Sequence, residues 1–136
     1  MATIERFEDV HAWQKGRELT QRVYLASRRG EFAKDFALRD QIRRAVISIT
    51  SNIAEGFERG GNKEFIQFLS HSKGSCGEAR SQLYVALDET YVAQDEFQEL
   101  YDMCIEISRL LDGFITYLKK TELKGRKFAS PQKTGS

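Results

Sequence analysis

This sequence has little proline, little cysteine and little histidine, and it lacks any long apolar run. One proline in 136 residues suits long, uninterrupted helices, because proline breaks helices. The two cysteines, Cys76 and Cys104, fit a reducing compartment better than a disulfide-stabilised scaffold. No segment reaches the roughly 20 apolar residues of a membrane span. The opening residues, MATIERFEDVHAW, lack the apolar core of a signal peptide. We therefore expect a cytoplasmic protein with no membrane partner.

A large net charge is also missing, since 21 Lys and Arg stand against 20 Asp and Glu and give +1. The whole molecule is therefore not a strongly basic nucleic-acid binder. The charges are unevenly distributed along the chain. Residues 95–118 hold six acidic residues and one basic residue, whereas residues 119–136 hold six basic residues and one acidic residue. These counts predict an acidic last helix followed by a basic tail.

Apolar residues recur at intervals of three and four in four segments, which is the pattern of amphipathic helices. We predict helices at about residues 7–29, 36–59, 63–90 and 95–120. Short connections make consecutive helices antiparallel neighbours, so residues 1–121 are predicted to form an all-α, up-down-up-down four-helix bundle. With 136 residues the chain has room for one such domain with a real core. Residues 122–136 lack periodicity and are predicted to form a flexible, disordered basic tail.

The second predicted helix contains VISIT, residues 46–50, whose β-branched alternation favours a strand in isolation. The helical period continues on both sides of it, so a helix is favoured. Its apolar stripe shares one face and consists of Leu38, Ile42, Ala45, Val46, Ile49, Ile53 and Phe57.

Particular residues are expected at the helix ends. Asp35 and Asn62 are suited to accept hydrogen bonds as N-caps, and Asp95 followed by Gln98 has the form of a capping box. Gly60 suits the left-handed conformation that follows a helix.

Two features bear on how the first two helices pack. Gly16 lies inside the first predicted helix, where it costs about 1 kcal/mol relative to Ala, and this indicates a close approach by another backbone. Phe32 and Phe36, in and after the first connection, are expected to fill the end of the core.

A row of polar side chains follows the second predicted helix on another face. Ser48, Asn52 and Glu55 repeat there at helical spacing. The row is either a ligand site or a buried hydrogen-bond network that fixes the register of the second helix against the small, polar middle of the third, where Ser75 lies. We favour the structural network. A buried Glu55 would need a cationic partner, because an unpaired buried charge is costly; the candidates are Arg44, Arg59 and Arg80.

Motifs for catalysis or cofactor binding are absent from the sequence. A di-metal bundle needs paired Glu-x-x-His motifs, and Glu8–His11 has this spacing whereas His71 does not follow a glutamate in this way. No strand-to-helix elbow presents a serine nucleophile. GFERGG lacks the lysine and hydroxyl of a phosphate-binding loop. We expect no catalytic residue, metal or cofactor, and interpret the cysteines as small core residues. An enzyme that uses the polar row is kept as a third hypothesis.

Basic residues gather in two clusters in the first half of the chain and again in the tail. Phosphate contacts need Lys or Arg and little else, so such clusters are compatible with nucleic acid without being specific for it. The alternatives are an ordinary solvated surface and pairing with the acidic fourth helix of another subunit. The residues predicted to bind nucleic acid are Arg28, Arg29, Arg39, Arg43 and Arg44.

Residues 39–75, RDQIRRAVISITSNIAEGFERGGNKEFIQFLSHSKGS, resemble the signature of the bacterial 23S rRNA intervening-sequence protein family. The matching elements are Gln41–Ala45, Ser48–Thr50, Asn52–Gly56, Lys63–Phe65 and Gly74–Ser75. Val10–Trp13 belongs to the resemblance too, which covers about residues 5–120. Thr50 departs from the family, because many relatives have proline there, and it predicts a straighter helix. Asn52–Gly56 and the following Gly60–Asn62 are interpreted as a structural lock between the second and third helices.

The resemblance implies a four-helix bundle that assembles as a homopentameric barrel. Some family members are encoded within insertions in 23S rRNA genes. The family is similar to accessory proteins of diversity-generating retroelements, which bind nucleic acid and a reverse transcriptase, and no enzymatic activity is established for it. Our leading hypothesis is therefore a non-enzymatic, homo-oligomeric protein that binds RNA or DNA. The alternative is an interaction scaffold that recruits a polymerase or a ribosome-associated protein.

Overall fold

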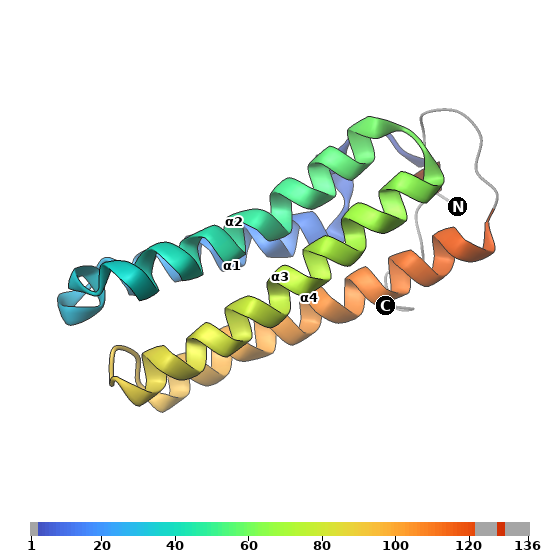
Figure 1. Ribbon diagram of the computed structural model, residues 1–136. Coiled ribbons are helices and arrows are strands. Elements are labelled where there is room, and N and C mark those ends of the chain that lie inside the picture. Colours follow the sequence, from blue (N-terminus) through green and yellow to red (C-terminus); the bar gives the residue numbers. More distant parts are fainter. Residues whose placement is uncertain (1–2, 122–127, 130–136) are drawn as a thin grey trace.

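Four long helices make up the structure, a computed structural model that describes residues 3–121 and 128–129. The helices are α1 (His11–Ser27), α2 (Phe36–Arg59), α3 (Asn62–Asp88) and α4 (Gln94–Lys120). Two short 3-10 helices, η1 (Phe7–Asp9) and η2 (Gly30–Lys34), precede α1 and α2. The hairpins α1–α2 and α3–α4 lie side by side (Figure 1), and each helix packs against its two neighbours in the order α1, α2, α3, α4. The predicted all-α, up-down-up-down bundle is thereby confirmed.

The core is a continuous apolar cluster to which every helix contributes. All seven residues of the predicted α2 stripe are buried, and α2 occupies the predicted residues 36–59. Phe65 is fully buried and its ring contacts Phe57 of α2 and Phe114 of α4 edge-on, with centroids 6.0 and 5.3 Å away. One aromatic side chain of α3 therefore joins three helices.

Two glycines mark close helix contacts. A Cβ added to Gly16 would lie 2.9 Å from the Thr50 side chain, which explains the glycine in α1 as an approach to α2. A Cβ added to Gly56 would lie 2.6 Å from the Cβ of Phe68, so α2 and α3 are closer still at that level. The lock that the sequence predicted near Asn52–Gly56 has a steric basis in this contact.

The helix ends follow the predictions in part. Asp35 caps α2, since its Oδ1 accepts the Leu38 N–H at 3.1 Å, and Gly60 adopts a left-handed φ of 82°. The N-cap of α3, however, is Gly61 and not the predicted Asn62. The Asn62 amide instead donates to the carbonyl oxygens of Leu118 (2.8 Å) and Thr121 (3.3 Å). Asn62 thus satisfies the free carbonyls at the end of α4, which lies beside the start of α3.

The predicted boundaries of two other helices also need correction. The first helix begins at His11 and not near residue 7, because Val10 is extended (φ −73°, ψ 122°) and directs a buried side chain into the core. The predicted capping box at Asp95 is wrong. Ala93 is the N-cap of α4, and Asp95 accepts the N–H of Glu96 at 2.8 Å.

A short antiparallel strand pair joins two segments that lie far apart in the sequence. β1 (Thr3–Ile4) pairs with β2 (Phe128–Ala129), with Thr3 opposite Ala129 and Ile4 opposite Phe128. The sequence predicted no regular structure in residues 122–136, and β2 corrects this at two positions, because β1 offers its backbone groups for pairing. Residues 122–127 and 130–136 of the predicted tail lie outside the described residues. No helix within the described ranges is long and apolar enough to cross a membrane.

Candidate functional site

The five arginines predicted to bind nucleic acid lie at one end of the α1–α2 hairpin, and we call them the arginine corner: Arg28, Arg29, Arg39, Arg43 and Arg44. Arg28 is the C-cap of α1 and Arg29 the N-cap of η2, whereas the other three lie in the first turns of α2. Figure 1 shows this connection at the end of the bundle where α3 gives way to α4. The hairpin therefore brings both arginine clusters to the same end of the molecule.

Arg29 is used inside the chain. It forms an ion pair with Glu96 of α4, and the hydrogen bond to that carboxylate raises the pKa of Arg29. Two further ion pairs continue along the same α1–α4 seam: Lys15–Glu106 at 3.9 Å and Arg22–Glu99 at 3.1 Å. In α3, Lys73 pairs with Asp112 of α4 at 2.8 Å. Four of the six acidic residues in the acidic helix are therefore paired with cations of the same chain.

Arg39 is braced by several groups from its own region. Its Nε donates to Asp40 Oδ1 at 3.0 Å and its Nη1 donates to the carbonyl oxygen of Ala33 in η2 at 3.0 Å. Its guanidinium carbon lies 4.8 Å from the ring centroid of Phe36, which is a cation–π distance. The side chain is thus held in one place against an aromatic ring.

Arg43 is held in a similar way between the two helices. Its Nε donates to the hydroxyl of Ser27 at 2.8 Å, and its guanidinium carbon lies 4.5 Å from the ring of Tyr24. Arg28 and Arg44 are exposed, and within residues 3–121 neither forms an ion pair. The corner therefore combines two braced guanidinium groups with two that are unpaired, and such groups are able to bind the oxygens of a phosphate.

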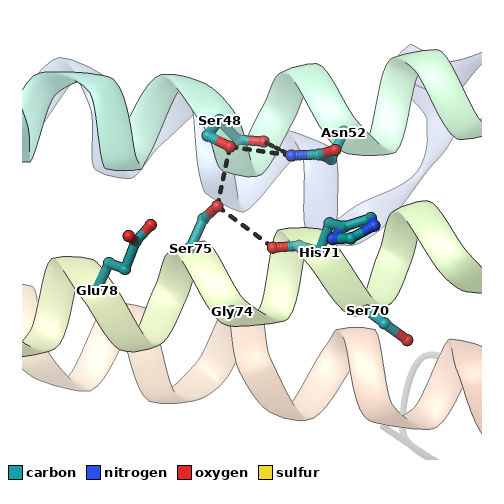
Figure 2. Close-up of a pocket in the computed structure, with 7 residues that line it drawn as sticks. All are labelled: Ser48, Asn52, Ser70, His71, Gly74, Ser75 and Glu78. Carbon is teal, nitrogen blue, oxygen red and sulfur yellow. Dashed lines mark hydrogen bonds between the residues drawn. The ribbon is translucent and has the colours of Figure 1, made fainter.

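The predicted polar network lies elsewhere, on the outer face between α2 and α3. Ser48 Oγ accepts hydrogen bonds from the Asn52 amide and from the Ser75 hydroxyl, both at 2.9 Å (Figure 2). The Asn52 amide also donates to the Ser48 carbonyl oxygen at 2.8 Å, and Ser72 donates to the Ile49 carbonyl oxygen at 2.8 Å. Three of the four predicted network residues are thus brought together across the α2–α3 contact.

Glu55, the fourth predicted member, points elsewhere. It is exposed and accepts a hydrogen bond from Arg59 at 2.8 Å, four residues further along α2. Arg59 was one of the partners considered from the sequence. The pair needs no burial to be satisfied, so Glu55 takes no part in joining α2 to α3.

A shallow hollow of about 420 Å³ opens above the Ser48–Ser75 contact, and His71 and Glu78 stand at its sides (Figure 2). Both side chains are exposed. No group of three His, Cys, Asp or Glu residues in the described part of the chain is placed to hold a metal ion. Burial raises the pKa values of Cys76 and Cys104 to about 12, so both thiols stay protonated at neutral pH.

The sequence analysis did not predict that Arg39 and Arg43 would each lie over an aromatic ring. Phe36 and Arg39 are three residues apart, a spacing that places side chains on the same helix face and was available as a signal. Tyr24 and Arg43 come from different helices, so only the packing of α1 on α2 reveals their contact.

The chain matches the family described as 23S rRNA-intervening sequence protein over residues 8–113. It is also similar to the crystal structure of a protein of unknown function from the S23 ribosomal protein family of Bacteroides thetaiotaomicron. That similarity has a TM-score of 0.69 and 23% identity, and it covers 76% of this chain and 97% of the other. At this identity the likeness concerns the fold. No curated protein matches the chain. The match to the family takes in most of the bundle, from η1 into the last turns of α4, and the chain therefore belongs to the 23S rRNA-intervening sequence protein family.

Proposed function

We propose that the protein is a non-enzymatic, self-associating bundle that binds nucleic acid through the phosphates, using the arginine corner. The observation that carries the proposal is the pairing pattern of these arginines. Arg28 and Arg44 are exposed without an acidic partner within residues 3–121, and they lie near the braced Arg39 and Arg43. Arg22 and Arg29, by contrast, form ion pairs with carboxylates of α4 and are less available to a ligand.

RNA is the first ligand to test. The family description names 23S rRNA, and the structural neighbour is described as a member of a ribosomal protein family. The contacts available at the corner are guanidinium groups, which bind phosphate oxygens without reading bases. We therefore propose binding with little sequence preference and a strong dependence on salt.

Replacing Arg28 and Arg44 together with glutamine is expected to weaken RNA binding roughly tenfold at low salt, because two phosphate contacts are lost. The slope of log affinity against log salt should fall by about 1 for each arginine. Fluorescence anisotropy over a salt series measures both quantities. The matched control is Arg17→Gln with Arg109→Gln, which removes the same charge from two exposed arginines outside the corner that form no ion pair within residues 3–121. Equal weakening by the two double variants, or an affinity that does not change with salt, would contradict the proposal.

Self-association is the second part of the proposal, and it rests on the ring that the family resemblance implies. A homopentamer of this 15.6 kDa chain is expected to have a solution mass of about 78 kDa. Light scattering coupled to size exclusion measures this mass directly. A monomeric mass at the protein concentrations used for the binding measurements would rule the homopentamer out.

An interaction scaffold is the alternative function. It is favoured by the exposed apolar side chains Tyr84 and Val85 in the last turns of α3, which are 49% and 45% exposed. A protein partner that co-purifies after nuclease treatment would support this alternative over nucleic-acid binding.

A further inference from the structure

Phe36 is the most unusual residue of the arginine corner. The sequence predicted that it would fill the end of the core with Phe32, and this is wrong for Phe36. Phe32 is buried and stacks on Tyr91 with centroids 5.2 Å apart, so Phe32 fills the core as predicted. Phe36 is 63% exposed, more than any other large apolar side chain of the described chain.

The backbone beneath Phe36 is anchored on both sides. Asp35 accepts the Leu38 N–H with one carboxylate oxygen and the Tyr91 hydroxyl, at 2.9 Å, with the other. That hydrogen bond raises the pKa of Tyr91 and ties the start of α2 to the α3–α4 connection. Phe36 is the first residue of α2, so its Cα is fixed by this cap.

The ring of Phe36 is positioned as well. The guanidinium of Arg39 lies over it at 4.8 Å and is itself fixed by Asp40 and by the Ala33 carbonyl oxygen. An exposed ring with a braced guanidinium beside it costs little entropy to order when a ligand binds. The arrangement does nothing for the core, because the ring is largely in water.

Aromatic rings beside cations form the platforms on which single-stranded nucleic acids stack. A base in a duplex is stacked between its neighbours and paired, so it does not reach such a ring without being displaced. Arg44 lies eight residues beyond Phe36 on α2, about 12 Å along the helix axis. A single strand with one base on Phe36 would extend a few nucleotides to bring a phosphate to Arg44.

We infer that Phe36 is a stacking platform that makes the arginine corner prefer single-stranded nucleic acid to duplex. This inference rests on the proposed function and specifies the form of its ligand. The cations supply attraction that any nucleic acid shares, whereas the ring supplies a contact that only an unpaired base completes.

The test uses the full chain and four labelled probes: oligouridylate, oligothymidylate, and RNA and DNA duplexes of the same length. Phe36→Ala is expected to weaken binding of the single strands about 5- to 100-fold, with the duplex affinity and the salt slope unchanged. Phe36→Trp is expected to retain the preference. Leu25→Ala is the matched control, because Leu25 is an apolar side chain that is 54% exposed on α1 and has no ring. The RNA and DNA arms show which sugar is preferred.

The possible outcomes distinguish a failure of the stacking platform from a failure of nucleic-acid binding by the arginine corner. Suppose that binding depends on salt, that single strand and duplex bind with equal affinity, and that Phe36→Ala changes neither affinity. This result would overturn the stacking platform and leave the proposed function standing. No binding of any probe at low salt would overturn both. If Phe36→Ala changes only the mass of the assembly, the Phe36 side chain is a contact between copies of the protein. The stacking platform is then overturned.

Discussion

Replacing Phe65 with alanine is expected to lower the free energy of unfolding by about 3–5 kcal/mol. Phe65 is 0% exposed, and its ring contacts Phe57 of α2 and Phe114 of α4. Truncation removes the apolar burial and both edge-to-face contacts, and it leaves a cavity between three helices that cannot all move inward together. Urea unfolding followed by circular dichroism measures the change at a fixed protein concentration, because self-association would make stability depend on concentration.

Phe36→Ala is the matched control, since it is the same chemical change at a ring that is 63% exposed. It should alter stability by less than about 1 kcal/mol, as expected of a surface substitution. A loss of similar size from the two variants would mean that the three-helix contact at Phe65 is not the source of the stability. The same control serves the binding test, because it shows that Phe36→Ala remains folded.

Hydrophobic periodicity was sufficient to predict the bundle. The α2 stripe repeats every three or four residues and every member is buried, so the helix and its buried face follow from spacing, and the short connections predict its neighbours. The Ser48–Ser75 contact was also foreseeable, because a polar row on α2 and a small, polar stretch on α3 have to meet if the helices are adjacent. Local spacing determines such features in advance.

Features that depend on contacts distant in the sequence were not foreseeable in this way. Asn62 has the right chemistry for an N-cap, yet it binds carbonyl oxygens 56 and 59 residues away at the end of α4. Glu55 was placed in the polar network by its spacing, but the nearer Arg59 satisfies it. Propensity gives what a side chain is able to do, and the tertiary neighbours decide which of those options is used.

The arginine corner shows the same division. The arginine clusters were visible in the sequence, but the partners of each arginine were not. Arg29 is neutralised by Glu96 of α4, and Arg43 is bound to Ser27 of α1. A count of basic residues therefore overstates the charge that is available to a ligand, and our proposal depends most on Arg28 and Arg44, which have no acidic partner within residues 3–121.

The contact between α2 and α3 gives the other large expected effect. Gly56→Ala should destabilise the protein by about 2 kcal/mol or more, because a Cβ there would lie 2.6 Å from the Cβ of Phe68 and 3.0 Å from the ring of Phe65. The Phe68 Cβ is attached directly to the backbone, so it cannot turn away as the end of a flexible side chain would. Relief requires α2 and α3 to separate, which would also stretch the Ser48–Ser75 hydrogen bond.

Gly74→Ala provides the comparison, because a Cβ at this exposed position of α3 would meet nothing within 4 Å. Alanine is there expected to stabilise the helix by about 0.5–1 kcal/mol through its higher helix propensity. The same substitution thus has opposite signs at two glycines of the family signature, and chemical denaturation of both variants measures the difference. If both variants gained stability, α2 and α3 would have room to spare at Gly56, and the lock between them would depend on the polar network alone.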